Sequence, residues 1–422
     1  MTTSPIHRPS TSTATTPVGS AEQWPALNAP RCSAVRATAA KLIFHRAVKT
    51  LPVRVALPGG ERIGAGGPGS PVMRIERPAD FFRRLGADAK IGFGEAYMAG
   101  DWTSNDPAAL LTPFAARMAE LVPRPLQVFR RWVDARQPDH ERNTVEGARA
   151  NIHRHYDLSN DLFAAFLDDS MTYSSAWFAP GSDDLHEAQL RKIDGVLDLA
   201  GVRSGSHVLE IGTGWGALAI RAARRGARVT TLTISAEQKH LAEQRIEQAG
   251  LADRVQVLLR DYREAHGSYD AVVSVEMIEA VGADYWPDYF TTLDRVLKPG
   301  GRIGLQAITM PHDRLLATRR SYTWIHKYIF PGGQLLSVPA IHEAVHRHTG
   351  LTATESRSLG PDYARTLHHW RARFLDNWPQ LTSNGFDETF RRMWEFYLAY
   401  CEAGFTSGYL DVVQLGLVKH HR

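Results

Sequence analysis

The stretch HVLEIGTGWG, residues 207–216, decides the fold of this chain. Its first five residues are typical of a buried strand, and Gly212, Gly214 and Gly216 then follow at every second position. Glycine lets the backbone come close to a ligand, and the helix expected next offers free N–H groups at its start. The stretch therefore predicts a strand-to-helix turn that binds a ligand.

Two features distinguish this turn from a dinucleotide-binding turn. Its spacing is G-x-G-x-G, which does not meet the G-x-G-x-x-G rule of dinucleotide-binding folds. Glu210 also stands two residues before the first glycine, where its carboxylate can accept a hydrogen bond from an ammonium group. A dinucleotide is therefore not the expected ligand.

Strands and helices alternate along the chain from this turn onwards. Apolar runs indicate further strands at 227–234, 255–261, 269–275 and 301–309, and helical patterns occupy 216–226, 235–250 and 285–301. Such alternation implies a parallel sheet with helices on both faces. The expected fold class is α/β, a doubly wound Rossmann-like sheet with helical insertions.

The N-terminal part of the chain differs in composition. Residues 1–30 are rich in Ser, Thr and Pro and are expected to form a disordered tail. Short strand patterns between Gly and Pro turns, followed by helical patterns, predict a small α+β domain at 31–120. A Pro-containing, charged connector is expected at 121–150, ahead of the large domain at 151–422.

A basic helix is expected near the start of the small domain. Residues 31–60 hold six Lys or Arg and no Asp or Glu. Within them an apolar stripe recurs at helical spacing: Val35, Ala39, Leu42, Ile43 and Ala47. Two interpretations remain open, a helix that lies on an anionic membrane and a helix whose stripe packs into its own domain.

Composition limits the functional classes. The chain has 422 residues, 43% of them hydrophobic and 22% charged, which is typical of a soluble protein of two domains. A net charge of +4 is too mild to indicate nucleic acid. Cys32 and Cys401 are the only cysteines, and no set of Cys or His has the spacing of metal ligands, so no metal site is expected. The sequence also has no apolar run of membrane length and no secretory signal, so we expect a cytoplasmic protein.

Six ordered motifs resemble one enzyme family. The acid-glycine turn, with RDY after a later strand and LKPGG before the last one, resembles class I S-adenosylmethionine methyltransferases. The motifs HYDLSNDLF (155–163), MTYSSAWF (171–178), VLEIGTGWGALA (208–219), TLTISAEQ (231–238), HKYIFPGG (326–333) and GPDYARTL (360–367) together resemble the cyclopropane fatty acid synthase family. The resemblance covers about residues 150–422, and GFGEAYMAGDW (92–102) extends it into the small domain.

The resemblance implies a reaction and a cofactor site. A methyl group passes from S-adenosylmethionine to the cis double bond of an acyl chain, and a base removes a proton from the resulting carbocation. Matching motif positions line the cofactor: Tyr173, Ser174, Glu210, Gly212, Gly214, Trp215, Gly216, Thr233, Ile234, Gln238, Asp261 and Tyr262. The second strand lacks the acid that usually follows it and binds the ribose. Gln238 and Asp261 are therefore expected to make the polar contacts with the ribose and adenine.

This chain departs from the family at the catalytic centre. The resemblance implies that family members use bicarbonate as base, held by Cys, Glu, His and Tyr side chains and an Ile backbone group. The Glu, Tyr and Ile are Glu279, Tyr363 and Ile308 here, whereas Ser175 replaces the Cys and Gln306 the His. Where relatives have a Gly, this chain has Glu276.

These changes fit together if Glu276 replaces the ion. A fixed carboxylate would occupy the space of bicarbonate and repel it, so bicarbonate is not an expected cofactor. We expect Glu276 and Glu279, three residues apart, to share one side of a helical turn after the strand, with Glu276 as base. Cys401 matches a Cys sometimes assigned as catalytic, but cation chemistry needs no thiol, so a structural role is favoured.

Aromatic faces would stabilise the cation. The candidates are Tyr173, Trp177, Tyr363 and Trp370, for each of which ordinary core packing is the alternative.

The pattern is most similar to the actinobacterial branch that makes 10-methylene and 10-methyl fatty acids, and the product, methylene-branched or cyclopropane, stays open. Expected partners are unsaturated phospholipid acyl chains and the anionic inner face of the membrane, where the enzyme would be peripherally associated. A homodimer is a further expectation, as is a reductase if the product is a methylene branch. Two alternatives remain, a small-molecule C- or N-methyltransferase and a non-catalytic lipid-binding module.

Overall fold

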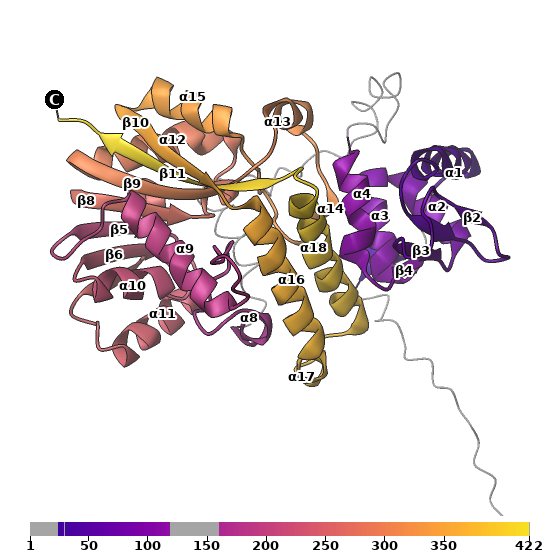
Figure 1. Cartoon of the computed structure of the whole chain (residues 1–422), viewed down its shortest axis with the longest axis horizontal. Helices are drawn as coiled ribbons and strands as arrows, with labels where there is room; N and C mark the ends of the chain where they lie inside the picture. Colours follow the sequence, from indigo (N-terminus) through magenta and orange to yellow (C-terminus); the bar gives the residue numbers. More distant parts are fainter. Residues whose placement is uncertain (1–23, 29, 119–159, 422) are drawn as a thin grey trace, which may run out of the picture.

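The computed structural model describes residues 24–28, 30–118 and 160–421 (Figure 1). The expected connector at 121–150 lies outside these residues, as does most of the expected tail. The part of the tail that is described contacts the body of the protein, because Trp24 Nε1 donates a hydrogen bond to the Asp387 carboxylate (2.8 Å).

The large domain is built on a seven-stranded sheet in the order β10-β11-β9-β8-β5-β6-β7. Its strands are β5 (His207–Ile211), β6 (Arg228–Thr233), β7 (Val255–Leu259), β8 (Tyr269–Val275), β9 (Leu297–Thr309), β10 (Leu351–Ser358) and β11 (Asp411–Lys419). β5 to β9 pair in parallel, and β11 runs antiparallel to β9 and β10. The expected doubly wound α/β fold is confirmed.

Helices cover both faces of this sheet (Figure 1). They are α9 (Leu185–Leu199), α10 (Ala217–Arg224), α11 (Ala236–Gln248), α12 (Trp286–Val296) and α15 (Val338–His348). Neighbouring residues of β5 enter opposite cores: Val208 packs in the cluster with α9 and α10, and Leu209 packs in the cluster with α12. The strand is therefore apolar on both sides, which is why its sequence does not alternate.

The order of the strands creates a crevice. β6 and β8 flank β5 on opposite sides, so the chain winds in two directions from the carboxyl end of β5. In open α/β sheets ligands bind at such a switch point. The glycine turn follows β5 and Glu276 follows β8, so both lie at this edge of the sheet.

The remaining elements of the large domain are mostly helical. They are α8 (Asn160–Phe166), α13 (His312–Thr318), α14 (Trp324–Tyr328), α16 (Gly360–Asp376), α17 (Trp378–Ser383) and α18 (Glu388–Thr406), with short 3-10 turns η3 (Tyr262–Glu264), η4 (Ile278–Ala280) and η5 (Ala283–Tyr285). No helix in the described ranges combines the length and the apolar composition of a membrane span.

The small domain has a four-stranded sheet in the order β2-β1-β3-β4. Its elements are η1 (Pro25–Leu27), α1 (Ala34–Val48), β1 (Arg54–Ala56), β2 (Arg62–Ile63), β3 (Val72–Ile75), α2 (Pro78–Ala87), α3 (Ala89–Ala99), β4 (Trp102–Ser104) and α4 (Pro107–Ala116). This is the α+β architecture expected from the sequence.

Helix α1 turns its apolar stripe away from this domain. Phe44 and Val48 are buried and attach the helix to the domain, with the Phe44 ring edge-on to Phe81 (5.2 Å between centroids). On the opposite side Val35 is 79% exposed and Leu42 68% exposed. The interpretation in which the stripe packs into its own domain does not agree with this arrangement.

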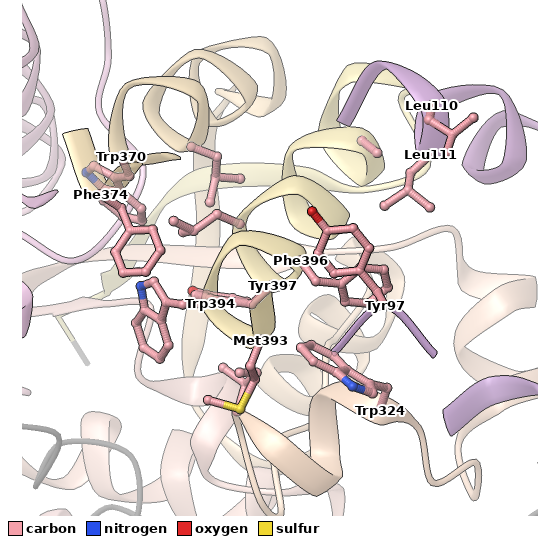
Figure 2. Packing of buried hydrophobic residues seen from close by; sticks show 14 of the residues in the cluster. Tyr97, Leu110, Leu111, Trp324, Trp370, Phe374, Met393, Trp394, Phe396 and Tyr397 are labelled. Carbon is pink, nitrogen blue, oxygen red and sulfur yellow. The ribbon is translucent and has the colours of Figure 1, made fainter. Parts of the chain in front are cut away.

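Helix α18 joins the two domains. It packs against α16 on one side and against α3 and α4 on the other, and Figure 2 shows the aromatic cluster that results. Glu95 of α3 adds a polar connection, because it accepts hydrogen bonds from Lys327 Nζ (2.6 Å) and the Tyr328 hydroxyl (2.7 Å). Gly94 lets the Trp324 ring come close, since a Cβ there would lie 2.5 Å from the ring. The motifs GFGEAYMAGDW and HKYIFPGG are thus two sides of one interface.

Candidate active site

The glycine turn after β5 requires glycine at each of its three positions. Gly212, Gly214 and Gly216 have φ values of +97°, +51° and +87°, which side chains with a Cβ rarely adopt. A Cβ built on Gly214 would meet no atom within 4 Å, so open space lies against the backbone there. Helix α10 starts directly after the turn and presents its first N–H groups.

Glu210 supplies a buried carboxylate beside this turn. It is 2% exposed, and its Oε2 has no hydrogen-bond partner among the described residues. Burial raises the pKa of the Glu210 carboxyl to about 8. An ammonium group placed beside it would pair with the free oxygen and favour the ionised form.

The other expected cofactor residues surround the carboxyl ends of β5 to β7. The Thr233 hydroxyl donates a hydrogen bond to Gln238 Oε1 (3.0 Å). Arg263 holds both oxygens of Asp261 (2.8 and 2.7 Å), so this carboxylate already has a partner. Trp215 Nε1 donates to Asn160 (2.8 Å).

Ile234, at the end of β6, is partly buried, whereas Tyr262 is buried and stacks edge-on against Tyr289 of α12 (5.5 Å between centroids).

Glu276 does not lie in the helical turn that the sequence suggested. Its φ is +48°, in the left-handed region, and the 3-10 turn η4 begins only at Ile278. The Glu276 amide still donates to the Gln306 carbonyl (2.9 Å), which continues the pairing of β8 with β9. A bend directly after the strand, and not a shared helix face, brings the two glutamates into one site.

The Glu276 carboxylate is surrounded by donors. Its Oε1 accepts hydrogen bonds from the Ser175 amide (2.8 Å) and from Gln306 Nε2 (2.8 Å), and the nearby Tyr363 hydroxyl helps to lower the pKa of the carboxyl. Burial raises its pKa above the ordinary value, while Lys192 and these hydrogen bonds oppose the rise. The positions that the resemblance assigns to bicarbonate binding therefore contact the Glu276 carboxylate in this chain.

Glu279 is hydrogen-bonded to the backbone of β9. Its Oε1 accepts a hydrogen bond from the Ile308 amide (2.5 Å), the backbone group that the resemblance assigned to bicarbonate. Burial and the neighbouring Glu276 charge raise the pKa of the Glu279 carboxyl to about 8. Glu279 therefore favours its neutral form at pH 7.

Aromatic rings form one wall beside these acids. Tyr363 packs edge-on against Trp370 (5.9 Å between centroids), and Tyr173 packs against the same indole (5.3 Å). The Tyr173 hydroxyl shares a hydrogen bond with Tyr397 of α18 (2.6 Å). Three of the four expected aromatics therefore lie together.

Trp177 and Cys401 do not fit a direct catalytic role. The Trp177 ring is stacked with the guanidinium groups of Arg357 (3.9 Å) and Arg191 (4.4 Å), so its faces are already in use by cations. Burial raises the pKa of the Cys401 thiol to about 12, which keeps it protonated at neutral pH. These contacts are in line with structural roles for both residues.

Two buried polar residues were missed from the sequence. Lys192 of α9 is 0% exposed, and its Nζ donates to the Ser174 hydroxyl (2.5 Å). Gln414 of β11 donates from one amide nitrogen to Gln306 Oε1 (3.0 Å) and to the Lys192 carbonyl (3.1 Å). The available signal was position: Lys192 falls on the same helical face as Leu185, Ala188 and Val196, where apolar residues are expected.

A family model described as mycolic acid cyclopropane synthetase matches residues 143–415. Tuberculostearic acid methyltransferase UfaA1 of Mycobacterium tuberculosis is 51% identical over 408 residues, covering 94% of this chain and 96% of that protein. Cyclopropane-fatty-acyl-phospholipid synthase of Escherichia coli is 34% identical over 357 residues, covering 81% of this chain and 86% of that protein.

Solved structures agree with these relatives. The cyclopropane synthase MmaA2 from Mycobacterium tuberculosis aligns with a TM-score of 0.60 at 32% identity, covering 64% of this chain and 98% of its own. The mycolic acid cyclopropane synthase CmaA1, complexed with SAH and CTAB, aligns with a TM-score of 0.59 at 33% identity, covering 67% and 99%.

The left-handed backbone at Glu276 predicts an order of stability for two variants. Glu276→Gly and Glu276→Ala remove the same carboxylate, but only alanine keeps a Cβ that disfavours this conformation. We expect the glycine variant to exceed the alanine variant by about 1 kcal/mol in the free energy of unfolding, after the larger unfolded-state entropy of glycine is subtracted. Urea denaturation followed by circular dichroism measures the difference, and an alanine variant of equal or greater stability would contradict the assigned backbone.

Proposed function

The chain belongs to the mycolic acid cyclopropane synthetase family, and from that premise we propose how its own residues perform the reaction of the family. It is an S-adenosylmethionine-dependent methyltransferase that modifies the cis double bond of unsaturated phospholipid acyl chains, to a 10-methylene-branched or a cyclopropane product. An identity of 51% over 94% of the chain does not favour the two alternatives, a small-molecule methyltransferase and a non-catalytic lipid-binding module.

The glycine turn and Glu210 fit S-adenosylmethionine. When bound, this cofactor supplies an electrophilic methyl group. Glu210 would hold the ammonium group with its unpartnered oxygen, and the open space at Gly214 admits the ligand against the backbone. Gln238 and Asp261 would hold the ribose and adenine, and Tyr173 and Ser174 would also line the cofactor.

Glu276 is the base in this proposal. The observation that supports it most directly is the pair of hydrogen bonds from Ser175 and Gln306 to its carboxylate, with the Tyr363 hydroxyl nearby. In a bicarbonate site such donors surround a free anion, whereas here they are bonded to the carboxylate of Glu276. A bicarbonate ion added to this site would find no free donors and would lie close to a like charge. Glu279 would act structurally, since its carboxylate bonds the Ile308 amide.

Methylation of an alkene leaves a carbocation, and the site must stabilise it without water. The Tyr363 and Trp370 rings offer negative faces, and the Glu276 carboxylate offers a full charge. Glu276 then takes a proton from the new methyl group. If the cation lies on the neighbouring carbon, the released electron pair closes a cyclopropane ring. If a hydride shift has first moved the cation to the methylated carbon, the same electron pair forms a methylene branch.

We favour the methylene product. The relative at 51% identity, which is named for tuberculostearic acid, supports this choice. Conversion of a methylene branch to a methyl branch needs a hydride donor, so a reductase would act next.

The outward face of α1 is proposed to bind an anionic membrane. Val35, Leu42 and Ile43 are exposed there, at 79%, 68% and 40%, and Arg46 and Lys49 are exposed on the same side of the helix. Apolar side chains would enter the interface while the cations meet anionic headgroups. Peripheral association with a membrane is proposed on this ground, and the inner face of that membrane, a cytoplasmic location and a homodimer stay predictions.

Removal of the base tests the catalytic proposal. Glu276→Gln keeps the size of the side chain and most of its hydrogen bonds but removes the proton acceptor, so the rate is expected to fall about 10²–10⁴-fold. Transfer of radiolabelled methyl groups to oleoyl phospholipid measures it. Glu264→Gln, a carboxylate of η3 outside this network, is the matched control and should keep the wild-type rate. Near-wild-type turnover of Glu276→Gln would refute the assignment.

Vesicle binding tests the membrane face. The double variant Val35→Asp, Leu42→Asp places two carboxylates on the outward face of α1 and should lose most sedimentation with vesicles that contain phosphatidylglycerol. Leu259→Asp alters a leucine that is 52% exposed at the end of β7 and should sediment like the wild type. Wild-type binding should also weaken at high salt, because charges are screened within about 8–10 Å at physiological ionic strength. Unchanged sedimentation of the double variant would exclude α1 as the contact.

A further inference from the structure

Lys192 is a buried cation that the reaction described above does not use. It lies on α9, one layer behind the site, and its side chain is fully buried. Its Nζ donates to the Ser174 hydroxyl (2.5 Å), and no ion pair within 4.0 Å involves it in the part of the chain that the structure describes. A buried ammonium without a paired carboxylate is costly, so a compensating charge nearby is expected.

Two short chains of hydrogen bonds connect this residue to Glu276. In the first, Lys192 holds the Ser174 side chain, and the next residue, Ser175, donates its amide to Glu276. In the second, Gln414 bonds both the Lys192 carbonyl and Gln306, whose amide group donates to the same oxygen of Glu276. The first chain depends on the Lys192 ammonium, whereas the second uses only the backbone carbonyl of that residue.

The groups next to Glu276 are mostly neutral at pH 7. Burial and the Glu276 charge raise the pKa of the Glu279 carboxyl to about 8, and Tyr363 from α16 contributes a neutral hydroxyl. Lys192 is the positive group that lowers the pKa of Glu276 against the effect of burial. Burial lowers the pKa of Lys192 itself to about 8, while the Glu276 and Asp168 carboxylates oppose that change. At pH 7 the lysine is therefore protonated and its charge acts across a region of low dielectric constant.

We propose that Lys192 is a positioning residue for the base: its ammonium keeps Glu276 ionised in the buried site, and its bond to Ser174 fixes the amide that orients the carboxylate. This inference rests on the proposed function of Glu276 as base. A lysine in this role touches neither the lipid nor the cofactor and acts through Glu276 alone.

The pH profile of turnover separates this role from simple packing. Lys192→Met keeps the length of the side chain but removes its charge, so the pKa of Glu276 should rise and the acid limb of kcat should move to higher pH. Each unit of that shift makes the rate about tenfold lower on the acid side. The deficit should shrink above pH 8, where wild-type Lys192 also loses its proton.

Lys192→Arg, which keeps the charge, should retain the wild-type acid limb even if its rate is lower. Lys298→Met removes a half-exposed lysine that pairs with Asp270 and is the control for loss of a lysine elsewhere; its profile should be unchanged. A deficit for Lys192→Met that is equal at every pH would overturn the proposal.

Thermal stability tests the charge coupling without turnover. Lys192→Met alone leaves the Glu276 carboxylate without its cation, so Tm should fall, and adding Glu276→Gln should restore more than half of the loss. Losses that simply add would overturn the proposed coupling. If the two changes couple in Tm but Glu276→Gln alone retains wild-type turnover, the assignment of the base fails while the charge role of Lys192 stands.

Discussion

One oxygen of Glu276 connects three separate parts of the chain. The Ser175 amide comes from the segment before α9, Gln306 comes from the middle of β9, and Glu276 itself follows β8 in a left-handed conformation. Such a conformation costs about 1–2 kcal/mol for a residue with a Cβ and persists only where the surroundings hold it. Here the pairing of β8 with β9 and the two side-chain contacts hold it.

This arrangement has a chemical consequence. A base attached to the backbone is present at every turnover and needs no ion from solution, but its carboxylate must stay ionised in a site closed to water. Burial alone would favour the neutral acid, as it does for Glu210 and Glu279, whose pKa values are raised to about 8. The charge of Lys192, the hydrogen bonds from Ser175 and Gln306, and the nearby Tyr363 hydroxyl act in the opposite direction on the pKa of Glu276. The different environments agree with the different roles proposed for the glutamates.

The sequence predicted the sheet and the glycine turn well, because both rest on local rules. Apolar runs that enter two cores specify the central strands, and the positive φ values after β5 strongly favour glycine. Motifs also placed Ser175 and Gln306 beside Glu276. The helical turn expected at Glu276 was wrong, because strand pairing continues through its amide and tertiary contacts stabilise a backbone that local propensity disfavours.

Lys192 was missed because its role depends on which residues face α9 across the fold. The orientation of α1 stayed undecided because this helix has apolar residues on two sides, Phe44 and Val48 on one and the exposed stripe on the other.

Glu276 is proposed to have replaced a diffusible base. The most direct test is the initial rate of methyl transfer to oleoyl phospholipid in buffer freed of carbon dioxide, measured before and after addition of bicarbonate at constant pH and ionic strength. A built-in carboxylate predicts the same rate in both conditions, because the donors of the site are already bonded to Glu276. A rate that rises several-fold with bicarbonate would contradict the claim.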